Sequence, residues 1–231
     1  MIKKHIPNFI TTLNLFSGCF AIYYGFQANY EMVMAFILIA AVFDFMDGLA
    51  ARILKAYSAM GKELDSLADV VSFGVAPGVL IFSLINESAL PDWMAFVGFI
   101  VPVFSALRLA KFNIDARQTS SFIGMPTPAN ALFWAGMGYS FSDLLIDNGL
   151  LTIVLAIVFC LFLVSEVPMF SLKFKNLSLK NNWVQYLFLV GSVALIVYFQ
   201  TKALALIIAW YLVLSAIIAV FSKKAKNQTV A

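Results

Sequence analysis

The stretch DFMDGLAARILKAYSAMGKELDSLAD, residues 44–69, concentrates polar groups in a chain that is otherwise almost entirely apolar. On a helix, side chains three, four, seven or eight positions apart lie on one face. Two such faces are present, one with Asp44, Asp47, Gly48 and Ala51, the other with Gly61, Asp65 and Asp69. We therefore expect two helices, joined by a turn near residues 57–61, that each point two carboxylates into a shared space.

Carboxylates within a membrane segment are costly, by about 2.5–3.5 kcal/mol each on insertion scales, so by default they mark a functional site. Four converging carboxylates also repel one another unless cations neutralise them. Oxygen ligands suit hard divalent cations, and the pattern therefore predicts a magnesium or manganese site. The alternative is ordinary charge pairing, for which Arg52, Lys55 and Lys62 are the basic residues nearby.

The composition of the whole chain is that of an integral membrane protein. Hydrophobic residues make up 62% of the 231 positions and charged residues 12%, against about 25% charged in soluble domains. The net charge of +3 does not indicate a nucleic-acid partner, because the basic residues are spread along the loops. Cys19 and Cys160 lie in separate apolar runs and are interpreted as small hydrophobic residues. No small-residue cleavage site follows the first apolar run, so we interpret this run as a retained span.

Apolar runs of about 20 residues, long enough to cross a bilayer, recur along the chain. They predict an all-α polytopic membrane bundle of about eight helices, at residues 9–27, 31–53, 66–86, 92–112, 127–143, 149–166, 184–200 and 203–222. The loops between these runs are short, which indicates a single domain over residues 1–231. Pro77 should kink the third span.

The basic residues predict the orientation of the bundle. With the N-terminus in the cytoplasm, 14 of the 15 lysines and arginines fall on the cytoplasmic side, and Lys202 lies outside. This asymmetry predicts a protein of the cytoplasmic membrane with both termini inside. Asp44 lies about 18 Å along its helix from Met32. The acidic stretch is therefore expected in the cytoplasmic half of the bilayer, where a site can meet both a soluble nucleotide and lipid chains.

The acidic stretch reads D-x-x-D-G-x-x-A-R-x8-G-x-x-x-D-x-x-x-D, with all eight fixed positions filled. This pattern resembles the signature of the CDP-alcohol phosphotransferase family, membrane enzymes that make phospholipids from CDP-activated donors. The resemblance implies a homodimer and a six-helix core at about residues 6–166, followed by extra spans at about 184–222. It also implies two divalent ions, Mg²⁺ or Mn²⁺, held by Asp44, Asp47, Asp65 and Asp69. Asp69 is in addition the implied catalytic base.

The resemblance further implies a binding site for CDP-diacylglycerol. Its residues are Asn8, Thr11, Gly48, Ala51, Arg52, Ser58 and Gly61. Gly48 and Ala51 lack bulk on the carboxylate face, which lets cytidine and pyrophosphate approach the backbone. Arg52 has the charge and fork geometry that suit phosphate. For Asn8 and Thr11, which lie one turn apart, simple capping of the first helix is the alternative.

Later segments resemble the branch of this family that uses serine as acceptor. They are residues 108–113 (RLAKFN), 122–128 (FIGMPTP) and 164–173 (VSEVPMFSLK). Lys111 stands where arginine is common in that branch. Arg108 and Lys111, one helical turn apart, and the following Asn113 are candidates for binding serine. Snorkelling of the two cations to the membrane interface is the alternative.

These observations predict an enzyme, embedded among membrane lipids, that transfers a phosphatidyl group from CDP-diacylglycerol to L-serine, giving phosphatidylserine and CMP. The first alternative is the same chemistry with glycerol 3-phosphate or inositol phosphate, because such acceptors would also require cations in the site. A cation transporter or channel is the alternative from another class. Against it, the carboxylates occupy two adjacent helices, and no pair of broken helices in matching halves suggests alternating access.

Overall fold

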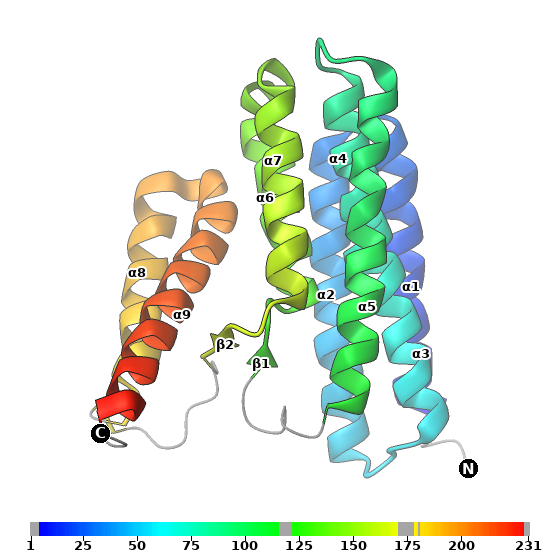
Figure 1. Ribbon diagram of the computed structural model, residues 1–231. Coiled ribbons are helices and arrows are strands. Elements are labelled where there is room, and N and C mark those ends of the chain that lie inside the picture. Colours follow the sequence, from blue (N-terminus) through cyan, green and yellow to red (C-terminus); the bar gives the residue numbers. More distant parts are fainter. Residues whose placement is uncertain (1–4, 116–121, 171–177, 180, 229–231) are drawn as a thin grey trace.

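The computed structural model is a bundle of long helices (Figure 1). It describes residues 5–115, 122–170, 178–179 and 181–228. The helices are α1 (His5–Phe26), α2 (Tyr30–Ile53), α3 (Ala59–Asp69), α4 (Ala76–Asn86), α5 (Ile100–Ile114), α6 (Thr127–Asp147), α7 (Gly149–Val164), α8 (Trp183–Phe199) and α9 (Ala203–Gln228). A π-helical turn (Val70–Val75) joins α3 to α4, and 3₁₀ segments precede α5 (Asp92–Phe99) and α9 (Gln200–Lys202). Two-residue strands, β1 (Phe122–Ile123) and β2 (Pro168–Met169), pair antiparallel.

The expected polytopic membrane bundle is confirmed. Five stretches of the described chain are long and apolar enough to cross a membrane: His5–Phe26, Tyr30–Ile53, Ala59–Asn86, Asp92–Ile114 and Trp183–Ala219. Gly149–Val164 is a shorter apolar helix. Each of the eight expected spans coincides with a helix or with a continuous series of helices. The short β1–β2 pair is an addition that the apolar pattern did not predict.

The third span is where proline changes the helix. Pro77 has no N–H to donate and its ring collides with the carbonyl one turn back, so a regular α-helix cannot pass through it. The chain takes a wider π turn before Pro77, in which the Ala76 N–H donates to the Val71 carbonyl. The turn begins directly after Asp69, so the last acidic residue lies where the helical pitch changes. Single π turns of this kind often lie at functional sites.

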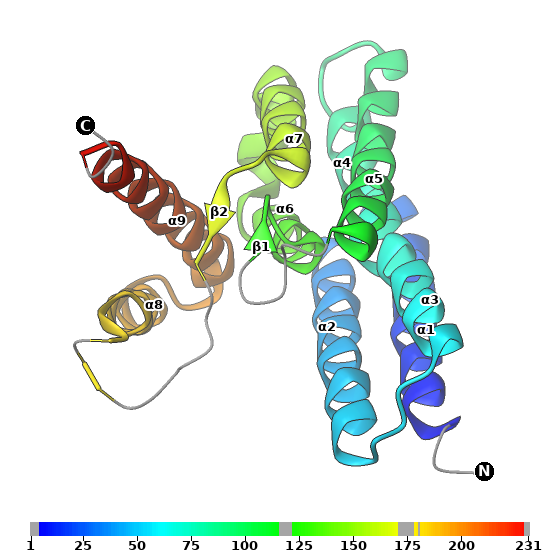
Figure 2. The same ribbon diagram turned by 60° about the horizontal axis from the view of Figure 1, so that its bottom comes forward.

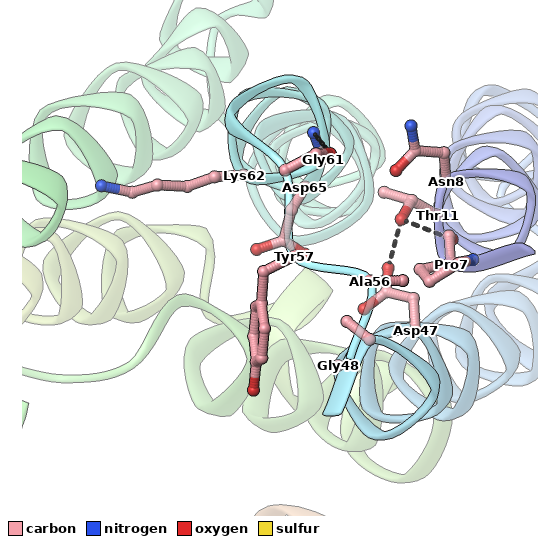
Figure 3. Close-up of a pocket in the computed structure, with 12 residues that line it drawn as sticks. Pro7, Asn8, Thr11, Asp47, Gly48, Ala56, Tyr57, Gly61, Lys62 and Asp65 are labelled. Carbon is pink, nitrogen blue, oxygen red and sulfur yellow. Dashed lines mark hydrogen bonds between the residues drawn. The ribbon is translucent and has the colours of Figure 1, made fainter. Parts of the chain in front are cut away.

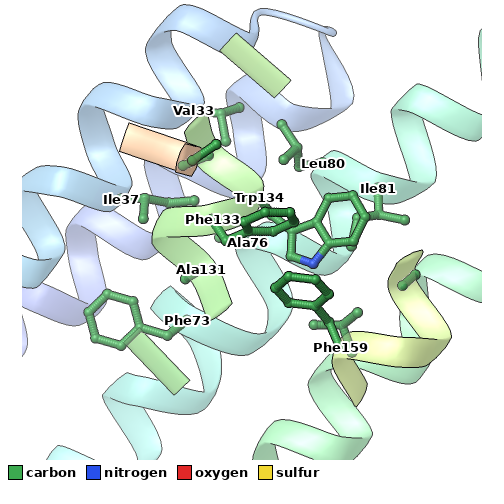
Figure 4. Packing of buried hydrophobic residues seen from close by; sticks show 14 of the residues in the cluster. Val33, Ile37, Phe73, Ala76, Leu80, Ile81, Ala131, Phe133, Trp134 and Phe159 are labelled. Atoms are coloured by element: carbon green, nitrogen blue, oxygen red, sulfur yellow. The ribbon is translucent and has the colours of Figure 1, made fainter. Parts of the chain in front are cut away.

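The apolar core lies among α2, α4, α6 and α7 (Figure 4). Trp134 of α6 is fully buried there. The neighbouring Phe133 stacks on Phe159 of α7 with ring centroids 4.0 Å apart. Stacked aromatic pairs add to the stabilisation that burial of their surfaces provides. The core thus fixes α6, whose first turns approach the polar end of the bundle.

Helices α8 and α9 form a hairpin on the far side of α6 and α7 from α1 and α3 (Figures 1 and 2). Gln200 turns the chain with a φ of 47°. The hairpin approaches the rest of the bundle at Gly136 of α6, where an added Cβ would come within 2.7 Å of the Ala205 backbone nitrogen. A glycine is therefore required at this contact between α6 and α9.

Candidate functional site

The acidic stretch folds into the end of α2, a turn and α3, as its two helical faces predict. Lys55, in the turn, adopts a left-handed conformation with a φ of 51°. Ser58 caps α3, because its hydroxyl oxygen accepts a hydrogen bond of 2.9 Å from the Gly61 N–H. The turn therefore sends α3 back alongside the end of α2, and the two acidic faces meet.

Three of the four aspartates form a group that fits a metal ion. Asp44, Asp47 and Asp65 each offer a carboxylate oxygen, and these oxygens lie within 4.8 Å of one another. Within the described residues, no lysine or arginine forms an ion pair with these three carboxylates. Such a set of oxygens suits magnesium or manganese rather than a soft metal. The expected convergence of these three carboxylates is confirmed.

Asp69 lies deeper, at the end of α3, with 7% of its surface exposed. It falls outside the group of three, but its carboxyl lies near enough to that of Asp44 for the two charges to repel each other. The Asn14 amide of α1 reaches Asp69 Oδ1 through a long hydrogen bond of 3.5 Å. Asp69 therefore lies next to the acidic group and is held from the other side by α1.

Helix α1 also holds Asp47. The Thr11 hydroxyl lies 2.6 Å from Asp47 Oδ2 and 3.0 Å from the Pro7 carbonyl oxygen, and its single proton can be donated to either acceptor. Thr11 and Asp47 are both buried. A buried hydroxyl donor at this distance fixes the orientation of the carboxylate. Thr11 thus contacts the acidic group directly. A residue that only capped the first helix would not need this contact.

A pocket of about 220 Å³ opens beside the acidic group (Figure 3). Three elements surround it: the start of α1, the end of α2, and the turn leading into α3. Its lining residues are Pro7, Asn8, Thr11, Asp47, Gly48, Ala51, Ala56, Tyr57, Ser58, Gly61, Lys62 and Asp65. Six of the seven residues expected at the donor site belong to this lining, which leaves Arg52 as the exception.

The two glycines of the pocket differ in what surrounds them. A Cβ added at Gly61 would come within 2.9 Å of Asn8 Oδ1 and 3.0 Å of Ser58 Oγ, so it would displace these two polar side chains, one of which caps α3. A Cβ at Gly48 would meet one atom within 4 Å, Arg52 Nη2 at 3.7 Å. Protein packing therefore gives no reason for a glycine at position 48, whereas a ligand in the pocket would.

Arg52 is exposed and folds back along its own helix. Its Nε donates a hydrogen bond of 3.1 Å to the Gly48 carbonyl. The guanidinium therefore lies next to the pocket wall without forming part of the lining. Rotation about its flexible side chain would be needed for Arg52 to contact a phosphate in the pocket.

The structure does not bring Arg108, Lys111 and Asn113 of α5 together on one ligand. Arg108 is buried, and its Nη1 donates to Thr127 Oγ1 over 3.5 Å. Lys111 pairs with Glu166 at 3.4 Å. Asn113 donates to Ser66 Oγ at 2.8 Å. Of the three, Arg108 is the one that also experiences electrostatic attraction from Asp69.

Sequence reasoning missed Asn14, which reaches Asp69, and Tyr57 and Lys62 in the pocket lining. Asn14 carried a signal, because it follows Thr11 by three positions and therefore continues the same polar face of α1. Lys62 and Tyr57 carried no such signal, since basic and aromatic residues are ordinary at a membrane interface.

Comparison with known proteins gives two findings. A family model described as CDP-alcohol phosphatidyltransferase matches residues 4–164. Curated relatives named CDP-diacylglycerol–serine O-phosphatidyltransferase include proteins of Bacillus subtilis, 36% identical over 150 residues, Mycobacterium leprae, 38% over 139, and Helicobacter pylori, 40% over 130. These matches cover 63%, 57% and 54% of this chain. They span 82% of the Bacillus protein but only about half of the other two, at 46% and 54%.

Proposed function

Since the chain belongs to the CDP-alcohol phosphatidyltransferase family, we propose that it transfers the phosphatidyl group of CDP-diacylglycerol to L-serine. The products are phosphatidylserine and CMP. The observation that carries this proposal is the convergence of Asp44, Asp47 and Asp65 beside a pocket where the end of α2 meets α3. The choice of serine rests on the relatives, which are named for that acceptor.

We assign the divalent cations to the four aspartates. Asp44 and Asp65 would bridge two ions, with Asp47 completing the first and Asp69 the second. Bound there, two divalent cations would neutralise the transferring phosphoryl group and align the attacking and leaving oxygens. Thr11 and Asn14 hold Asp47 and Asp69 in place from α1, so that these carboxylates need no rearrangement on binding.

The pocket would hold the cytidine and pyrophosphate of the donor. Gly48 and Ala51 leave room on α2, Asn8 and Ser58 offer polar groups, and Gly61 lets α3 approach α1. Arg52 would turn from the Gly48 carbonyl towards the phosphates, which its charge favours.

Asp69 would serve as the general base. It accepts the proton of the serine hydroxyl as that oxygen forms a bond to the β-phosphorus of CDP-diacylglycerol. The bond from the β-phosphorus to the oxygen shared with the CMP phosphate breaks, and CMP leaves. Arg108, which is buried and attracted by Asp69, would bind the serine carboxylate. Lys111 and Asn113 would have to release Glu166 and Ser66 to join it.

The assembly and placement complete the proposal. Eight spans would cross the cytoplasmic membrane with both ends and the pocket on the cytoplasmic side, as the lysines and arginines indicate. A homodimer is implied by resemblance to the family. Light scattering in mild detergent should give the mass of two chains, and a fully active monomer would contradict the dimer.

An acceptor panel tests the function. Purified protein with CDP-diacylglycerol and Mg²⁺ or Mn²⁺ should release CMP and form a lipid product with L-serine, and chelation should stop the reaction. CMP release with glycerol 3-phosphate or inositol phosphate but not with serine would overturn the acceptor and leave the family chemistry intact. Cation flux without CMP release would favour a transporter.

A further inference from the structure

A buried amide in α6 has a hydrogen-bonding capacity that the described residues do not use. Asn130 is completely buried. Neither its Oδ1 nor its Nδ2 has a hydrogen-bond partner among the described residues. Buried side-chain amides are normally bonded, because an unmet donor or acceptor loses its hydration without compensation. An apolar residue such as its neighbour Ala131, which is also buried, would avoid this penalty.

Asn130 lies one helical turn from a residue that contacts Arg108. Thr127, one helical turn before it, accepts the hydrogen bond from Arg108. Because α5 and α6 run in opposite directions (Figure 1), the turn of α5 that precedes Arg108 and the turn of α6 that follows Thr127 lie at the same level. That turn of α5 carries Ser105, which is fully buried and whose hydroxyl also has no partner among the described residues. Asn130 and Ser105 thus lie one turn beyond Arg108, which Asp69 attracts.

We propose that Asn130 binds the amino-acid part of the acceptor, an assignment that rests on the proposed function. L-serine presents a carboxylate, an ammonium group and the attacking hydroxyl in a compact molecule. Nδ2 of Asn130 donates to the carboxylate beside the Arg108 guanidinium, and Oδ1 accepts from the ammonium. An amide supplies both a donor and an acceptor without adding charge. This neutrality suits a zwitterion whose carboxylate already has a cationic partner.

Replacement of Asn130 by leucine separates recognition from folding. Leucine has the branched shape of asparagine but more volume, and no hydrogen bond among the described residues is lost, so Asn130→Leu should stay folded with at most a small change in Tm. The KM for L-serine should rise about tenfold or more, while the KM for CDP-diacylglycerol should change less than about twofold. Asn130→Ala provides a second variant, smaller than the native side chain, that should show the same split between the two KM values.

Thr152→Val in α7 is the matched control. Thr152 is as completely buried as Asn130, but its hydroxyl donates to the Leu145 carbonyl at 2.8 Å. This variant should lower Tm and leave both KM values unchanged.

The outcomes distinguish the two proposals. Serine-dependent turnover with an unchanged serine KM in both Asn130 variants would overturn this assignment and leave the function standing. Parallel rises in both KM values with a lower Tm would show a structural role and overturn it as well. Wild-type protein that releases CMP with another acceptor, but not with serine, would overturn the proposed function itself.

Discussion

At the scale of single residues, the aspartates are the groups whose loss should matter most. Asp44→Asn, Asp65→Asn and Asp69→Asn each remove a charge from the proposed metal cluster, and each should lower kcat more than about tenfold while the protein remains inserted and folded. Asp47→Asn should be milder, because Asp47 is assigned to one ion. CMP release measured at saturating Mn²⁺ checks these expectations.

Glu63→Gln is the control for this series, since Glu63 is an exposed acid on the same helix as Asp65 and Asp69. It should keep wild-type activity. An Asp44, Asp65 or Asp69 variant that retained more than about a tenth of wild-type turnover would remove that residue from its assigned role.

The two pocket glycines give a second prediction, with opposite expectations for the same change. The added methyl of Gly48→Ala meets only the Arg52 side chain at an ordinary contact distance, so Tm should be unchanged or slightly higher, while the KM for CDP-diacylglycerol should rise because the methyl occupies ligand volume. Gly61→Ala meets Asn8 and Ser58 and should lower Tm. Thermal unfolding in detergent and donor titration measure both effects. Equal donor KM values for Gly48→Ala and wild type would place the donor elsewhere.

The helix face that a site residue occupies could be predicted from the sequence, whereas its partners on other helices could not. Asp44, Asp47 and Asp65 converge as their helical spacing predicts, because membrane carboxylates are rare and their periodicity fixes the face that they share. The same spacing put Arg108 and Lys111 on one face but could not show that Lys111 pairs with Glu166. Periodicity says which side chains are neighbours on one helix and leaves their partners on other helices undetermined. Asn130 is uncharged and stood out in no pattern.

At the scale of elements, α4 packs closely against the 3₁₀ segment that precedes α5. A Cβ at Gly98 would come within 2.6 Å of the Gly78 carbonyl oxygen and 2.7 Å of the Phe82 backbone nitrogen. Backbone atoms cannot move aside as a flexible side chain can. Gly98→Ala should therefore destabilise the protein by about 1–3 kcal/mol, as overpacking does, and lower its Tm.

The control for Gly98→Ala is Gly48→Ala, the same chemical change at a position where the added methyl makes only an ordinary contact with the Arg52 side chain. If the two variants had the same Tm, the close contact between these elements would not exist as described.

The places of the helices were predictable, but their internal geometry was not. Each apolar run became helical, because a membrane leaves the backbone few other ways to satisfy its hydrogen bonds. Pro77 predicted a disturbance of the third span, and the disturbance is a six-residue π turn that starts directly after Asp69. The missing N–H of proline shows that a hydrogen bond is lost, but not how the preceding turn widens. β1 and β2 depend on residues far apart in the chain, which local patterns do not reveal.

At the scale of the whole molecule, the distribution of charge and the arrangement of the helices both distinguish one end of the bundle from the other. The N- and C-termini lie at the same end of the bundle, and the α4–α5 and α6–α7 connections lie at the other (Figure 1). The pocket lies at the end that holds the termini, beside the turn between α2 and α3. A water-soluble acceptor and the CMP product would therefore enter and leave from the side that the lysines and arginines assign to the cytoplasm.

This orientation gives the last prediction. In a background with Cys19→Ala and Cys160→Ala, which removes both native thiols, Asp92→Cys and Asp147→Cys place a reactive group at the end opposite the termini. Both positions are exposed, as is Ile114 at the other end of α5. In intact cells, a membrane-impermeant maleimide should label the first two variants and should label Ile114→Cys only after permeabilisation, because the basic loops stay on the cytoplasmic side. Labelling of Ile114→Cys alone in intact cells would show the opposite orientation. The pocket would then face the outside of the cell rather than the cytosol.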